Sequence, residues 1–183
     1  MMVVGLGVTL SAAAVPQSLS ALDDVRASGA AHHVSARLQR ARMEAVRRSA
    51  MVGLQIVPSP DGHYTYGLYV DGNRNGVLSI EIQRGVDRPI APEERLADQF
   101  GGVEFGVVPG LPSIDPGGTP PGADPIHLGA GSIASFSAVG TATSGTVYIR
   151  GRRNAQYAVR IFGETGKTRM MKFESRARKW RQL

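Results

Sequence analysis

The first charged residue in this chain of 183 residues is Asp23. The segment before it, Met1 to Leu22, contains only apolar and small residues, a few hydroxyl groups, Gln17 and a single proline, Pro16. An Ala/Arg-rich segment with helical spacing follows directly, and a Gly-rich segment with strand spacing comes next. An uncharged helix that continues into a surface helix and then into a β domain is typical of a membrane anchor, or of the stem by which a domain is built into a filament.

Three interpretations of the uncharged segment remain open. A membrane-spanning helix needs about 20 apolar residues, and the most apolar stretch, Met1 to Val15, is shorter and lacks the basic start of a secretory signal. Cleavage at the small residues Ser11 to Ala14 would release a periplasmic β protein, and a buried core helix is the second interpretation. We favour the third, a membrane helix whose first turns lie upstream of Met1. Pro16 then kinks the helix without ending it, because the apolar spacing resumes at Leu19.

Residues 23–51 have the spacing of an amphipathic helix. Four apolar residues fall on one stripe, which we expect to cover the β domain: Val34, Leu38, Ala41 and Ala45. Four arginines on the flanks of the stripe are expected to lie in solvent: Arg37, Arg40, Arg47 and Arg48. His32 and His33 point about 100° apart on a helix, so they cannot bind one metal together, and we interpret both as surface residues.

From Val52 onward the apolar residues alternate with a period of two, which predicts antiparallel strands with one buried face. The alternation is found in residues 64–70, 78–82 and 103–107, and again in 132–137 and 145–173, where three consecutive strands form a meander. Residues 109–131 hold six of the 11 prolines, and we expect a long surface loop there without a strand or a helix. The predicted fold class is therefore α+β.

Few residues in this chain suggest chemistry. The absence of cysteine excludes disulfides and thiolate metal sites. No motif of a known catalytic type is present, and we expect neither an enzyme nor a cofactor. Residues 71–76 resemble the first half of a calcium loop, but Ile82 stands at the twelfth position where such loops carry a glutamate. We therefore interpret this segment as a hairpin turn.

The C-terminal segment carries most of the net charge of the chain. Residues 164–183 contain seven Lys/Arg and two Glu, a balance of +5 out of the total of +6. Cations in such a segment can neutralise phosphates, and Trp180 could stack on a base. The candidate nucleic-acid contacts are Lys167, Arg169, Arg176, Arg178, Lys179, Trp180 and Arg181. The alternative is a strand with a solvated outer face that ends in a polar tail.

Three parts of the sequence resemble the GspH/FimT family of pseudopilins. The stretch Ile133 to Ile149, with Phe136 before a Gly-Thr turn, and its sequel Ala158 to Ile161 with Thr165-Gly166-Lys167, are similar to the C-terminal signature of that family. The Arg/Ala-rich residues 36–48 are similar to its stem, and Pro16 lies where pilin-like stems carry a kinking proline. The Gly-Phe-Thr-Leu-Ile-Glu type motif that a prepilin peptidase cleaves is absent, and in an alignment on Pro16 it would end just upstream of Met1.

The resemblance implies a pilin-like fold, in which a long helix packs on an antiparallel, sandwich-like β head. It implies a bacterial inner-membrane protein with a single span and a periplasmic head. We expect a membrane or filament-core helix at 1–22, a stem helix at 23–51 and a β domain at 52–183 with the loop 109–131 and a basic tail at 174–183.

The family also implies the partners of the chain. These are other pseudopilin subunits, met through stem residues such as Val15, Pro16 and Leu19, the inner membrane, and a prepilin peptidase if an upstream motif exists. The function expected is that of a minor pseudopilin of type II secretion. The alternative is a FimT-like minor pilin of a type IV pilus, with DNA as a further partner.

Overall fold

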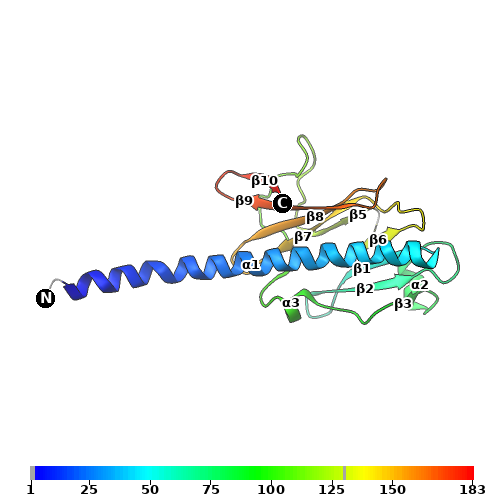
Figure 1. The fold of residues 1–183 in the computed structure, drawn as a ribbon, viewed down its shortest axis with the longest axis horizontal. Coiled ribbons are helices and arrows are strands. Elements are labelled where there is room, and N and C mark those ends of the chain that lie inside the picture. The colour runs from blue at the N-terminus through cyan, green and yellow to red at the C-terminus, as the bar shows by residue number, and fades with distance from the viewer. Residues whose placement is uncertain (1–2, 130) are drawn as a thin grey trace.

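The computed structural model describes residues 3–129 and 131–183, with side chains described from Leu19 onward. One long helix, α1 (Val3–Arg48), runs from the N-terminus across a β domain built of two antiparallel sheets (Figure 1). The helix passes through Pro16 without a break, as the sequence predicted. Within the described part of the chain, no helix is both long enough and apolar enough to cross a membrane. The α+β class with a long helix on antiparallel sheets is confirmed.

The first sheet has four strands in the order β3-β2-β1-β6, and the second has six, with β10-β9-β8-β7-β4 in order and β5 also paired with β7. The strands of the first sheet are β1 (Val52–Pro58), β2 (Tyr64–Val70), β3 (Arg88–Pro89) and β6 (Ile133–Phe136). Those of the second are β4 (Glu104–Phe105), β5 (Ile126–Leu128), β7 (Gly145–Arg150), β8 (Gln156–Ile161), β9 (Thr168–Glu174) and β10 (Lys179–Gln182). The predicted meander is therefore confirmed as β7-β8-β9.

The face of α1 that meets the β domain is made of small residues. Its buried side chains are Ala27, Ala30, Ala31, Val34, Leu38, Ala41 and Ala45. They include the whole predicted stripe, and the small alanines let the helix approach the strands closely. Gly29 allows the ring of Phe100 to lie close to the helix backbone, because a Cβ at this position would be 2.9 Å from that ring.

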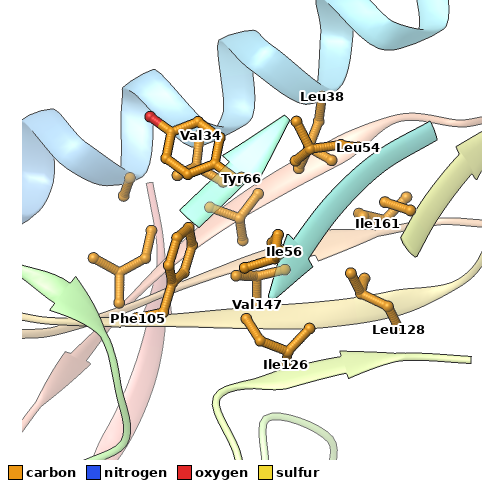
Figure 2. Packing of buried hydrophobic residues seen from close by; sticks show 14 of the residues in the cluster. Val34, Leu38, Leu54, Ile56, Tyr66, Phe105, Ile126, Leu128, Val147 and Ile161 are labelled. Atoms are coloured by element: carbon orange, nitrogen blue, oxygen red, sulfur yellow. The ribbon is translucent and has the colours of Figure 1, made fainter. Parts of the chain in front are cut away.

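The main core lies between α1 and the two sheets (Figure 2). Leu38 points from the helix toward Leu54 of β1, and Ile126 and Val147 of the second sheet close the far side (Figure 2). The ring of Phe105 meets that of Tyr66 edge-on, with centroids 5.7 Å apart. Alternate residues of each strand supply these contacts, so the period-two pattern in the sequence accounts for the core.

Two predicted elements differ in the structure. Residues 79–83 form a short helix, α2 (Ser79–Gln83), where the sequence predicted a strand; Leu78 and Ile80 are exposed, so the alternation there buries nothing. The segment before it is not a hairpin turn, since it connects β2 to α2. The carboxylate of Asp71 holds that loop by accepting the backbone N–H groups of Asn73, Arg74 and Gly76. A second short helix is α3 (Leu96–Gln99).

The segment 109–131, expected to be a loop without regular structure, contains strand β5 and covers the outer face of the second sheet. Leu111 is buried there with Val107, Tyr148 and Ala158 in a second, smaller core. The expectation of no strand was wrong because β5 is only three residues long and depends on pairing with β7. Burial raises the pKa of Tyr148 to about 12.

Candidate functional site at the junction of stem and head

We call α1 up to Leu22 the stem, and the β domain at residues 52–183 the head. The stem leaves the head at Asp23, whose buried carboxylate accepts the backbone N–H groups of Arg153 (2.9 Å) and Ala155 (3.3 Å) in the turn between β7 and β8. A Cβ on Gly151 would lie 2.6 Å from this carboxylate. Because any side chain at that position would collide with Asp23, the turn needs glycine there.

Asp24, the next residue, bonds to two other strands. Its carboxylate accepts a hydrogen bond from the hydroxyl of Tyr157 on β8 (2.9 Å) and one from Nζ of Lys172 on β9 (2.7 Å). The hydrogen bond to Asp24 raises the pKa of Lys172, and burial together with Asp24 raises that of Tyr157. Both groups therefore keep their protons at neutral pH. The bonds of Asp23 and Asp24, the first charges in the chain, fix the direction in which the stem leaves the head.

A second polar contact joins α1 to the segment before α3. The carboxylate of Glu94 accepts hydrogen bonds from His33 (3.0 Å) and from the hydroxyl of Tyr66 (3.2 Å), and it pairs with Arg37. Burial alone would raise the pKa of Glu94, but the bond from His33 and the charge of Arg37 outweigh it and lower that pKa. His33 and Arg37 are therefore part of the helix–head interface, which corrects the expectation that both lie in solvent.

A third contact lies nearer the end of the helix. The hydroxyl of Ser35 and the amide of Gln39 hydrogen-bond to the hydroxyl of Thr168 at the start of β9 (2.8 and 3.1 Å). Together with the contacts of Asp24 and Glu94, this holds α1 against the head at three levels. The part of α1 from Asp24 to Gln39 is therefore attached to the head by hydrogen bonds as well as by apolar packing.

Several large apolar side chains of α1 are exposed. Leu19, Leu22 and Val25 are 41%, 44% and 67% exposed, and Met43 and Val46 are exposed farther along. Leu19 was predicted to take part in stem packing; the side chains of the two other predicted residues, Val15 and Pro16, lie outside the described ones. Exposed apolar side chains on a helix that projects from a head can bind a second helix.

The structure gives several predicted nucleic-acid residues other roles. Trp180 is packed on Tyr148 and Phe173, and its indole N–H donates to the carbonyl of Pro112 (3.0 Å). Arg181 pairs with Glu174, and Arg178 donates to the carbonyl of Gly110. These contacts join the C-terminal hairpin, β9 and β10, to the segment around Leu111. They hold both against the second sheet.

The remaining predicted cations stay exposed. Lys167, Arg169, Arg176 and Lys179 have no carboxylate partner among the described residues, and the guanidinium of Arg169 lies over the ring of Phe162. Lys167 directly precedes β9 and Arg169 lies near its start, while Arg176 belongs to the turn before β10 and Lys179 begins β10, so the four do not form one cluster. No group of His, Asp or Glu side chains in the described part of the chain could hold a metal ion.

Sequence reasoning missed the junction residues. Nothing local in the sequence connects Asp24 to Lys172 or His33 to Glu94, since 148 and 61 positions separate the partners. The one available signal was that Asp23 and Asp24 are the first charges after the uncharged segment. Their side chains bond to the head, while the uncharged row continues outward.

A long N-terminal helix that packs on an antiparallel β head and projects beyond it is the arrangement of a pilin-like fold. The model of the protein family described as Type II transport protein GspH matches residues 30–165, well over half of the chain. The chain belongs to this family of pseudopilins. No curated protein and no solved structure matches it.

The family match fixes the general role of the chain. GspH proteins are structural, non-enzymatic pseudopilins of type II secretion, which associate with other pseudopilins in a pseudopilus and are anchored in the inner membrane with a periplasmic head. The matched residues include His33 with its partner Glu94, and strands β7 and β8 on either side of the turn that is bonded to Asp23.

Proposed function

We propose that this chain is a minor pseudopilin that works near the tip of a type II secretion pseudopilus, in assembly and protein export. Residues 1–22 are the membrane and filament-core helix, 23–51 the stem helix on the head, and 52–183 the periplasmic β domain. Val15, Pro16 and Leu19 contact the helices of neighbouring subunits. The role is mechanical, since the helix supplies cohesion and the head supplies recognition.

The observation that carries this proposal is the division of α1 between two partners. The small residues around Ala31 pack on the head of the same chain, whereas Leu22 and Val25 point away from it and are exposed. Burying one such side chain against another helix contributes about 1.5–3 kcal/mol. Exposed apolar side chains of this kind support a helix that packs with others, first in the membrane and later in a filament core.

Deletion of the gene in its own host, followed by complementation, tests the proposal. We expect deletion to reduce the amount of protein secreted into the medium, and the unaltered gene to restore it. The variants Leu22→Ser and Val25→Ser should fail to restore secretion, while Val139→Ser, a change of the same kind at an exposed apolar residue in the turn after β6, should restore it. Unchanged secretion after deletion would contradict the proposal.

A second candidate is a FimT-like minor type IV pilin that acts in pilus biogenesis or DNA uptake. The observation in its favour is the group of exposed cations without carboxylate partners, Lys167, Arg169, Arg176 and Lys179. The internal contacts of Trp180, Arg178 and Arg181 leave these three residues less suited to bind a nucleic acid. Loss of pili or of DNA uptake after gene deletion, with secretion unchanged, would favour this candidate.

A gel shift with the full chain in detergent tests the DNA contact itself. If the C-terminal cations bind DNA, changing Arg176 and Lys179 to Gln should weaken binding, with a shallower dependence on salt. Changing Arg84 and Arg88 to Gln, which removes the same charge from the other end of the head, is the matched control. Absence of binding at low salt, or equal weakening in both variants, would exclude a specific DNA contact at the C-terminal segment.

A further inference from the structure

Four exposed arginines lie on or beside α1 where the stem leaves the head. We call them the arginine collar: Arg26, Arg152, Arg153 and Arg176. The turn before β8 and the turn before β10 lie on the side of the head from which α1 runs out toward the N-terminus, as Figure 1 shows. Arg26 is one turn of helix beyond Leu22, or about 6 Å along the axis at 1.5 Å per residue. The collar therefore begins where the uncharged segment ends.

The contacts of the four arginines place them on neighbouring segments beside the helix. Arg26 reaches the carbonyl of Gly101, and the side chain of Arg152 lies against Gly102. The backbone of Arg153 is bonded to Asp23, and a groove of about 530 Å³ at the stem is lined by both Arg153 and Arg176. The collar thus follows the perimeter of the stem from the segment after α3 to the last hairpin.

The acidic side chains near the collar are mostly taken up by other partners. Asp23 is buried on backbone N–H groups and Asp24 is bonded to Lys172. Three further carboxylates pair with cations outside the collar: Glu104 with Arg150, Asp61 with Arg95 and Glu174 with Arg181. Asp98 of α3 is the exposed carboxylate near this end that has no ion pair. No collar guanidinium has a carboxylate partner among the described residues, so the base of the head presents a net positive charge.

We propose that the arginine collar binds the phosphate groups of anionic phospholipids in the membrane that holds the stem. This rests on the proposed function, since it needs the segment before Asp23 to lie in the bilayer. A helix that enters the bilayer at Leu22 brings the base of the head to the headgroup level, where guanidinium groups bind phosphate through paired N–H donors. The contact would hold the head on the membrane before assembly and would be released when the subunit moves into a filament.

The test uses the full chain, reconstituted in vesicles of neutral phosphatidylcholine or of phosphatidylcholine with one quarter phosphatidylglycerol. The chain has no cysteine, so Ser175→Cys in the last hairpin gives a unique site for a spin label. We expect anionic lipid to lower the accessibility of this label to a water-soluble relaxation agent about twofold, and 0.5 M salt to reverse the change, because salt screens exposed charges. A label at Val139→Cys, which is 86% exposed in the turn after β6, should not respond.

Matched variants separate the collar from general charge. Changing Arg152, Arg153 and Arg176 to Gln should abolish the response to anionic lipid, while the same change at Arg74, Arg84 and Arg88 should leave it intact. Two results would overturn the collar alone. In the first, the chain floats with neutral vesicles but anionic lipid does not change the accessibility of the label at Ser175. In the second, both triple variants lose the response to anionic lipid equally. Failure to float with either vesicle would overturn the membrane stem and the collar together. Protection of Ser175 by added single-stranded DNA but not by anionic lipid would assign the collar to nucleic acid and overturn the proposal.

Discussion

The two faces of α1 use different residues for different partners. The face toward the head is built of alanines with Val34 and Leu38, and it is completely buried. The face away from the head carries Leu22, Val25 and Met43, which are larger and exposed. The small residues of the inner face allow close approach to the head, and the exposed apolar residues are those that we propose to contact other chains.

The largest effect on stability is expected from a cavity on the inner face. Leu38→Ala should lower the free energy of unfolding by about 2–5 kcal/mol, because Leu38 is fully buried against Leu54. Met43→Ala on the outer face should change it by less than about 0.5 kcal/mol. Denaturant unfolding of the full chain in detergent measures both, and equal effects would contradict the division of the helix into two faces.

The contact of Glu94 should rank next. Glu94→Gln removes a charge that accepts bonds from His33, Tyr66 and Arg37, and we expect a loss of about 1.5–3 kcal/mol in the free energy of unfolding. Glu93→Gln is the matched control next to it, since Glu93 binds only the hydroxyl of Tyr69 and does not contact α1. If Glu93→Gln lowers the free energy of unfolding more than Glu94→Gln does, the polar contact with the helix is not the more important of the two.

The same contact predicts a dependence on pH. The pKa of Glu94 is lowered in the folded chain from an ordinary value of 4.5, so the unfolded chain binds more protons as the pH falls below that value. The stabilisation from Glu94 is therefore complete above about pH 4.5 and is lost as the pH falls through the lower, folded value. Denaturant unfolding measures the free energy of unfolding at pH 6 and at pH 3.5. The difference between the two values should be smaller in Glu94→Gln than in the unaltered chain. An equal difference in both chains would exclude this contribution of Glu94.

The smallest effect on stability is expected at the junction. Asp24→Asn weakens the bonds to Tyr157 and Lys172, and because these groups are partly exposed we expect a loss of about 1 kcal/mol. The main effect should be on the direction of the stem. The distribution of distances between a spin label on the stem and one on the head should therefore become broader. Asp98→Asn, which removes an acidic group that has no ion pair, is the control. A narrow distance distribution in Asp24→Asn would mean that packing alone fixes the stem.

The sequence predicted the parts of this fold that depend on local periodicity. The stripe through Val34 and Leu38 and the meander from Gly145 follow from spacing, because each element there buries one regular face. Strand β5 and helix α2 were not predicted, since β5 depends on pairing with β7 and the alternation from Leu78 buries nothing.

The junction was hidden for a similar reason. The carboxylates of Asp24 and Glu94 find partners far along the chain, and Trp180 looked available for stacking until Tyr148 and Pro112 were placed beside it. Spacing in one sequence shows which face of an element is apolar. It does not show which distant residue meets a particular charge or ring.

Photo-crosslinking from the outer face of α1 tests the central claim most directly. A benzoylphenylalanine placed at Val25 in the secreting host should form covalent adducts with the N-terminal helices of other pseudopilin subunits, identified by mass spectrometry of the joined peptides. The same group at Val139, which is also apolar and exposed, should give no adduct with such a helix. Absence of adducts from Val25, or adducts that map only to the heads of other proteins, would contradict the account of α1 as a helix with one face for its own head and one for its neighbours.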